Sequence, residues 1–296
     1  MGLYKQPNDW TCGPFALKHA LVTIGRLTDE QTIARIANPH WWAGTNEVKL
    51  ARAARHFDCD LPMVRRTDPD RAKQALVRYM SQKLPVILCV DQWDHWITVV
   101  RYEHERFVLL DSRYEPVVQV TEWRRLRERW QYEDEDEDDG KTFFDMHPVK
   151  PRFKVEARAQ FSVERAQFLR RPENELLALH WDAYLGDLLQ ICRPPGRKSN
   201  TMSMAEFLRR HQGLLVARVM YWHGHLARPQ VERVLKNFRF VAETYGLIVP
   251  AASTRQALVD LAILLALWAA ASGGVDAMYG SDQASRPKPR RRRQTR

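Results

Sequence analysis

The sequence predicts an α+β domain over residues 1–150, followed by an all-α helical domain over residues 151–275. In the first part, apolar side chains recur at helical spacing and then give way to short β-branched runs separated by turn residues. Helices that precede antiparallel strands in this order are typical of an α+β domain. In the second part almost every segment has helical spacing again. Residues 276–296 are polar and basic, and we expect them to form a disordered tail.

The N-terminal helices have apolar stripes and recognisable ends. A helix that begins at Cys12 is expected to end before Gly25. Thr28, with Gln31 three residues later, predicts a capping box for the second helix. Thr45 is expected to be the N-cap of the third. The four helices are expected at 12–24, 30–37, 46–57 and 69–82.

The strands follow, and the second part is helical. Each expected strand is a run of apolar or β-branched residues bounded by turn residues. The strands are expected at 86–90, 95–102, 106–111, 117–120 and 141–149, with a short helix at 121–130. The later helices are expected at 163–169, 174–191, 204–226, 229–245 and 254–271, and we expect this helical domain to position a protein substrate or partner.

Cys12 is the candidate nucleophile. The thiolate is the reactive form of cysteine, and a helix N-terminus favours an anion because its N–H groups are unpaired. Gln6 lies six residues before Cys12. Its side-chain amide, with the backbone N–H of Cys12, is expected to stabilise the oxyanion that forms when a thiolate attacks a carbonyl.

His95 and Asp111 are the candidate base and orienting group. They lie in two runs that read as a β-hairpin, and a loop at 103–105 would pair Tyr102 with Arg106. Asp111 would then lie opposite Ile97, two residues from His95. A loop one residue shorter or longer would place the two side chains on opposite faces. Asp91 and Asp94 are alternative orienting carboxylates, and His40-Trp41-Trp42 either line a substrate groove or form a structural aromatic cluster.

These residues resemble those of a known family. The ordered set Gln6, Cys12-Gly13-Pro14, His95 and Asp111-Ser112, together with Gly44-Thr45-Asn46 before a helix, is similar to the double-glycine leader peptidases that process bacteriocin precursors. The resemblance covers the first half of the chain, and it implies a papain-like cysteine peptidase fold and a Cys-His-Asp triad. With no ATPase segment in the sequence, it implies a stand-alone form without a transporter.

Composition restricts the alternatives. The four cysteines, Cys12, Cys59, Cys89 and Cys192, show no CxxC spacing, so we expect no metal site and no cofactor, and a reducing, cytoplasmic location. The apolar stretch 257–271 is too short to span a bilayer. Seven of the basic residues behind the net charge of +10 fall in the tail, which is a candidate contact for nucleic acid or an anionic surface.

The sequence therefore predicts a cysteine peptidase that hydrolyses a peptide bond in a protein or peptide through a thioester acyl-enzyme. Two alternatives stay open. An acyltransferase or amidase would use the same triad with a different acceptor or a side-chain amide. A catalytically idle binding or regulatory module would keep the fold without the chemistry.

Overall fold

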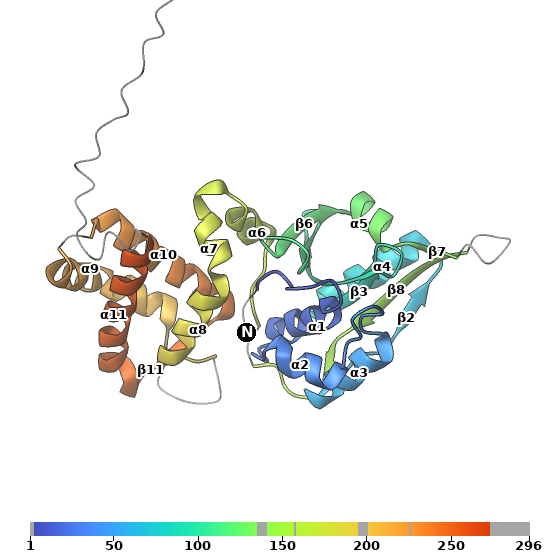
Figure 1. The fold of residues 1–296 in the computed structure, drawn as a ribbon, viewed down its shortest axis with the longest axis horizontal. Helices are drawn as coiled ribbons and strands as arrows, with labels where there is room; N and C mark the ends of the chain where they lie inside the picture. Colours follow the sequence, from blue (N-terminus) through green and yellow to red (C-terminus); the bar gives the residue numbers. More distant parts are fainter. Residues whose placement is uncertain (1–2, 135–140, 157, 195–200, 225, 273–296) are drawn as a thin grey trace, which may run out of the picture.

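A computed structural model gives the fold of the chain (Figure 1). An antiparallel sheet with helices on both faces occupies one end, and a group of helices occupies the other. The expected tail, 276–296, lies outside the described residues. The structure describes residues 3–134, 141–156, 158–194, 201–224 and 226–272.

The central sheet has the strand order β2-β8-β3-β4-β5-β6, and the short strand β7 pairs with β8. All neighbouring strands are antiparallel. The expected strands are confirmed, whereas β1, β2, β7 and β9 were not expected because two or three residues are too few to show an alternating pattern. The strands are β1 (Cys59–Asp60), β2 (Val64–Arg66), β3 (Val86–Val90), β4 (His95–Glu103), β5 (Arg106–Leu110), β6 (Val118–Glu122), β7 (Tyr132–Glu133), β8 (Thr142–Pro148) and β9 (Lys150–Pro151).

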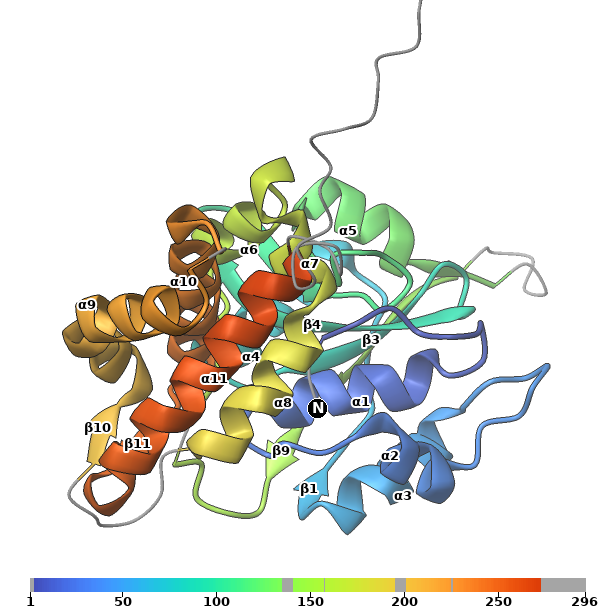
Figure 2. The ribbon, with the colours of Figure 1, turned by 60° about the vertical axis from the view of Figure 1, so that its left-hand side comes forward.

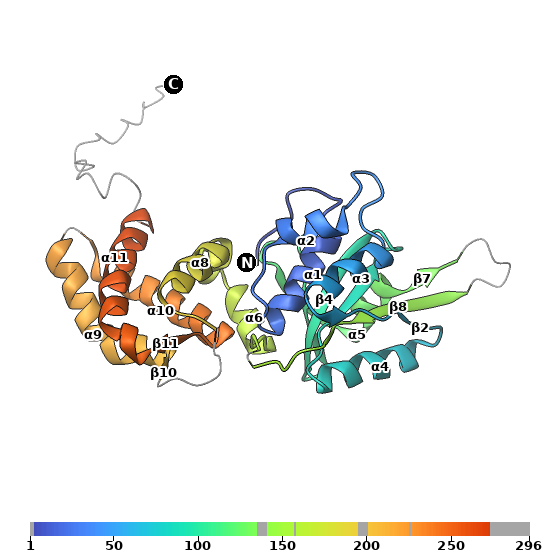
Figure 3. The ribbon, with the colours of Figure 1, turned by 90° about the horizontal axis from the view of Figure 1, so that it is seen from below.

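Helices cover both faces of this sheet, as Figure 3 shows. In the fully buried β3, Ile87 and Cys89 pack with α1, α2 and α3, and Leu88 packs with α4 and α5. Alternate residues of a strand face opposite sides, so one strand contributes to two hydrophobic layers. The helices are α1 (Cys12–Thr23), α2 (Glu30–Ala37), α3 (Glu47–His56), α4 (Pro69–Ser81) and α5 (Trp123–Trp130).

Two expected helix caps are wrong. The N-cap of α2 is Asp29, whose side chain accepts from the backbone N–H of Thr32, so there is no capping box at Thr28. The N-cap of α3 is Asn46, whose side chain accepts from the backbone N–H of Lys49, instead of Thr45. In both cases the residue after the expected cap is an Asx side chain, which ranks above threonine as an N-cap.

The hairpin of β4 and β5 has a shorter loop than expected. Glu103 pairs with Arg106, so only two residues form the turn and Tyr102 does not pair with Arg106. That change alone would shift the register by one residue. A β-bulge between Val99 and Arg101 shifts it back, because Thr98 pairs with Leu110. Ile97 comes just before Thr98, and Asp111 comes just after Leu110. These two residues therefore lie opposite each other, as the three-residue loop predicted.

The C-terminal helices pack against one another (Figure 2) and also extend a shared core. One hydrophobic cluster joins them to Val108, Leu110 and Val118 of β5 and β6. The division into two domains remains a prediction. The helices are α6 (Val163–Leu169), α7 (Glu175–Leu179), α8 (Trp181–Ile191), α9 (Met204–Trp222), α10 (Arg228–Tyr245) and α11 (Thr254–Ser272).

The helical part departs from the sequence prediction at three points. The helix expected at 174–191 is divided into α7 and α8 at His180, after a short 3₁₀ turn. The strands β10 (Thr201–Ser203) and β11 (Ile248–Pro250) pair within a region that was expected to be all helical. In the part of the chain that the structure describes, one helical stretch, Ala251–Ala271, has the length and apolarity of a membrane span, and core helices of soluble proteins share these properties.

Candidate active site

Cys12 is the first residue of α1, and it is 3% exposed. Every residue of α1 is buried, so the position of this thiol is fixed by the surrounding core. The next residue must be small: a Cβ at Gly13 would lie 2.8 Å from the Cβ of Thr45. The N-terminus of α1 can therefore approach the loop before α3 only because residue 13 is glycine. The N–H groups at this helix start have no acceptor within the helix.

His95 is the first residue of β4 and is fully buried. Its Nε2 lies 2.7 Å from Oδ1 of Asp111, which confirms that the hairpin brings these two side chains together. Its Nδ1 is buried and has no hydrogen-bond partner of ordinary geometry among the described residues. The hydroxyl of Thr98 donates to the carbonyl of Ala16 at 2.6 Å, so strand β4 is joined directly to helix α1.

The pKa of His95 reflects its neighbours. Burial alone would lower this pKa, but the hydrogen bond to Asp111, the proximity of the Cys12 thiol and the negative charges of both groups raise it above the ordinary value. Cys12 is therefore close enough to influence the imidazole. Burial would raise the pKa of Asp111, but the hydrogen bond from His95 and the charge of Arg129 hold it below its ordinary value. The pair is thus stabilised as an imidazolium and a carboxylate.

Arg129 is a part of the site that the sequence prediction missed. Its Nη1 donates to Oδ2 of Asp111 at 3.0 Å, on the side of the carboxylate away from His95. Its Nε and Nη2 donate to the two oxygens of Asp91 at 2.9 and 2.8 Å. The expected helix at 121–130 contains this residue, but it also contains three other arginines. Apart from the neighbouring Trp130, nothing in the spacing of these arginines distinguishes the one that binds a buried carboxylate from those that face solvent.

The alternative carboxylates have other partners. Asp91 binds Arg129 and Arg113, and Asp94 is 83% exposed with Arg113 3.5 Å away. Neither carboxylate hydrogen-bonds to His95. Of the three candidate carboxylates, Asp111 is therefore the one that hydrogen-bonds to His95 in this structure.

Gln6 lies beside this group through Ser112. Its backbone N–H donates to the carbonyl of Ser112 at 2.9 Å, and its Oε1 accepts from the Ser112 hydroxyl at 2.6 Å. Its Nε2 donates to the carbonyl of Asn8 at 2.7 Å. The side chain is thus held firmly just before Cys12, with one of its two amide N–H bonds used within the N-terminal segment. Its role as an oxyanion donor stays a prediction.

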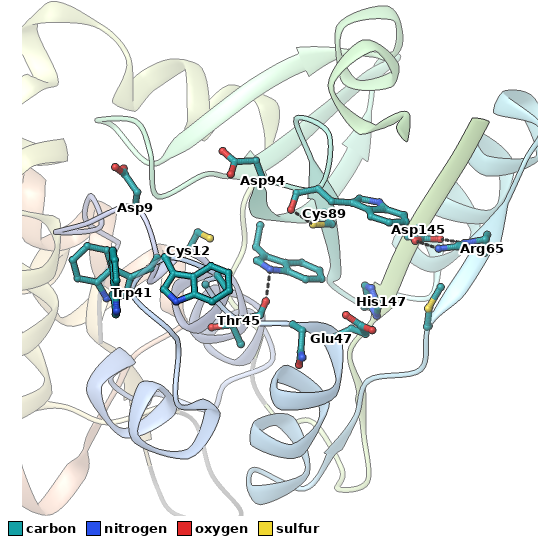
Figure 4. Close-up of a pocket in the computed structure, with 18 residues that line it drawn as sticks. Asp9, Cys12, Trp41, Thr45, Glu47, Arg65, Cys89, Asp94, Asp145 and His147 are labelled. Carbon is teal, nitrogen blue, oxygen red and sulfur yellow. Dashed lines mark hydrogen bonds and ion pairs between the residues drawn. The ribbon is translucent and has the colours of Figure 1, made fainter. Parts of the chain in front are cut away.

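A cavity of about 440 Å³ opens beside Cys12. Figure 4 shows Cys12 between two ends of this pocket, with Asp9 and Trp41 at one end and the Arg65–Asp145 ion pair at the other. Cys12 lines the pocket, whereas Gln6, His95 and Asp111 lie outside its lining. Trp41 and Trp42 both line it, whereas His40 lies outside its lining and packs against both indoles, so the substrate groove stays a prediction beside the aromatic cluster. Within the described ranges, no group of three or more His, Cys, Asp or Glu side chains is placed to hold a metal ion.

The comparisons with known proteins give structural likenesses only. No protein-family model and no curated protein matches the chain. The chain is similar to the peptidase domain of Streptococcus ComA, a bifunctional ABC transporter involved in quorum sensing, with 17% identity and a TM-score of 0.39 over 51% of this chain and 98% of that one.

Two other solved structures are similar at the same level. A double-glycine motif protease from an AMS/PCAT transporter, in complex with the leader peptide, has 13% identity and a TM-score of 0.36 over 49% of this chain and 90% of that one. The peptidase domain of Streptococcus mutans ComA has 18% identity and a TM-score of 0.31 over 49% of this chain and 98% of that one. At these values the functional conclusion must rest on the geometry of Cys12, His95 and Asp111.

Proposed function

We propose that this protein is a cysteine peptidase in which Cys12 is the nucleophile, His95 the general base and acid, and Asp111 the orienting carboxylate. The observation that carries the proposal is the position of the two ring nitrogens of His95. One ring nitrogen is fixed by Asp111, and the other is buried without a conventional partner, next to a thiol at a helix N-terminus that lines a pocket. This is the arrangement of nucleophile, base and orienting group that covalent catalysis needs.

The reaction follows from these positions. The Cys12 proton moves to Nδ1 of His95, and Sγ attacks the peptide carbonyl carbon. The backbone N–H of Cys12 and the second N–H of the Gln6 amide stabilise the oxyanion. His95 then protonates the departing amine, which leaves a thioester on Cys12. The same imidazole removes a proton from water, whose oxygen attacks the thioester carbon; the C–S bond breaks, the acid is released, and the proton returns to Sγ of Cys12. A reducing compartment such as the cytoplasm would keep Cys12 available as a free thiol.

The first test is the selective alkylation of Cys12. The folded protein is treated with iodoacetamide at mildly acidic pH, and all four cysteines are mapped by mass spectrometry. The other three are internal controls, because burial raises the pKa of Cys59 to about 11, that of Cys192 to about 12 and that of Cys89 further still. A thiolate paired with an imidazolium reacts under these conditions, whereas protonated thiols do not.

We expect labelling of Cys12 in the wild type and its loss in His95→Ala, with full labelling retained in the exposed control His56→Ala. Equal, slow labelling of Cys12 and Cys59 would refute an activated nucleophile and favour an idle binding module. If Cys12 is activated, products from a peptide library with and without added amines then separate hydrolysis from acyl transfer.

A further inference from the structure

The pocket beside Cys12 is unusually aromatic. Trp41 and Trp42 are each 71% exposed, in a loop closed by a bridge between His40 and Gly44. Side chains this large and this exposed do not fill a core, so their position needs another explanation. Five of the ten tryptophans in the chain line this one cavity: Trp10, Trp41, Trp42, Trp93 and Trp96.

Two of these five rings are fixed in place. The indole N–H of Trp96 donates to the carbonyl of Thr45 at 2.9 Å, which holds the loop before α3 against β4. Trp93 stacks on Tyr132, with ring centroids 3.6 Å apart and planes within 4° of parallel. A ligand that enters the pocket therefore meets a wall at Trp93 and Trp96 that is already ordered, and little entropy is lost in arranging this part.

The same pocket is acidic although the whole chain carries a net charge of +10. Its lining contains four carboxylates and a single arginine, Arg65, which is already bound by Asp145 through two contacts of 2.7 Å. Burial lowers the pKa of His147, the histidine of the lining, which keeps that ring neutral. Within the described part of the chain, Asp9 and Glu47 have no ion-pair partner.

One buried polar atom in the lining also lacks a partner. Thr45 is 4% exposed, and its hydroxyl oxygen makes no hydrogen bond among the described residues. A buried hydroxyl without a partner is costly, so such an atom is usually satisfied by water or a ligand.

From the indoles and the unpaired carboxylates that line this cavity, we propose that the pocket binds the side chain of an arginine or lysine in the peptide substrate. Indole faces attract cations, unpaired carboxylates add to this attraction, and a guanidinium supplies N–H donors. Because Cys12 lines the same cavity, the basic residue lies within one or two positions of the carbonyl that is attacked. This inference rests on the proposed function only for the position of the cleaved bond.

Binding is measured without turnover, so that the two proposals can fail separately. Full-length Cys12→Ala protein is titrated by calorimetry with two capped hexapeptides that differ at one position, arginine or citrulline. Citrulline has almost the same shape as arginine but no charge. The pair is tested with that residue at each of the six positions. We expect the arginine peptide to bind about tenfold more tightly at one or two adjacent positions, and less so at high salt.

The variants identify the groups responsible. In the Cys12→Ala background, Asp9→Asn with Glu47→Gln is expected to remove most of the preference for arginine. The matched control Glu173→Gln with Glu175→Gln, which removes two exposed acids of the helical part, is expected to keep it. Trp42→Leu is expected to weaken the binding of both peptides, and to weaken that of the arginine peptide more.

Equal affinity for the two peptides, no binding of either, or a preference that survives Asp9→Asn with Glu47→Gln would each overturn the inference. A clear preference together with a Cys12 thiol that does not react with iodoacetamide would leave the cationic site standing and remove the peptidase proposal.

Discussion

Replacement of Arg129 by methionine tests how the carboxylate of Asp111 is held. The substitution keeps an unbranched, flexible side chain, two atoms shorter than that of arginine, and removes its charge and its donors. Oδ2 of the fully buried Asp111 then loses its contact of 3.0 Å, and Asp91 loses two further bonds. Arg129 itself is 27% exposed, so solvent replaces it only in part.

The expected cost follows from burial. Removing one partner of a buried ion pair typically costs about 3–5 kcal/mol. Asp111 keeps its hydrogen bonds from His95 and from the backbone N–H of Arg113, so we expect a loss at the lower end of this range. The control is Arg124→Met on the same helix, whose arginine is 85% exposed and pairs with Glu128 four residues later. An exposed pair of this kind contributes only about 0.3–0.5 kcal/mol. The two variants therefore differ about tenfold in their effect on the free energy of unfolding.

The difference should also depend on pH. The pKa of Asp111 is held below its ordinary value in the folded protein, so its ionisation contributes stability above about pH 3.9 that is lost as the pH falls through the folded value. Without Arg129 the folded pKa of Asp111 rises, and this contribution disappears at a higher pH. The difference in the free energy of unfolding between wild type and Arg129→Met is thus largest near neutrality, and it becomes smaller below about pH 5.

The assay is urea denaturation at pH 7, 5 and 4, with the slope of the transition compared between proteins to check that the unfolded state is unchanged. A double-mutant cycle with Asp91→Asn separates the contact to Asp91 from the contact to Asp111. A loss for Arg129→Met no larger than for Arg124→Met, or a loss that is the same at all three pH values, would refute this role of Arg129.

Two further substitutions test the site itself. Gly13→Ala should lower the free energy of unfolding by about 1–3 kcal/mol and slow the alkylation of Cys12, because its methyl group would overlap Thr45. In the control Gly213→Ala, a Cβ meets no atom within 4 Å, so this variant should be neutral or stabilising. Similar behaviour of the two variants would count against the close packing at Gly13. Asp111→Asn should lower kcat/KM for peptide cleavage about a hundredfold or more. It should also move the alkaline limb of the pH profile to lower pH by about one unit, because the negative charge that raises the pKa of the imidazole is removed. An equal effect of the exposed Asp94→Asn would show that the orienting carboxylate is misassigned.

The hairpin shows how a sequence argument can reach the correct pairing through an incorrect intermediate. The position of Asp111 beside His95 was derived from a three-residue loop, and the loop has two residues. The bulge next to Val99 compensates for the missing residue. Hydrophobic alternation in the sequence does not reveal a bulge. Whether a strand accommodates one extra residue depends on how it packs against its neighbours.

What the sequence determined by itself is local or periodic. The helix that begins at Cys12, the strands that carry His95 and Asp111, and the amide of Gln6 just before the nucleophile are all visible as residue types at characteristic spacings. Buried β3 is visible as well, because a run of five apolar residues cannot be placed in solvent.

The tertiary structure decided the contacts between segments far apart in the chain. The bond from Arg129 to Asp111, the approach of Gly13 to Thr45, and the gathering of Trp41 and Trp42 with distant carboxylates in one cavity leave no periodic signal. Such contacts depend on the packing of whole elements, and an arginine that anchors a buried carboxylate has the same local sequence environment as one that extends into water.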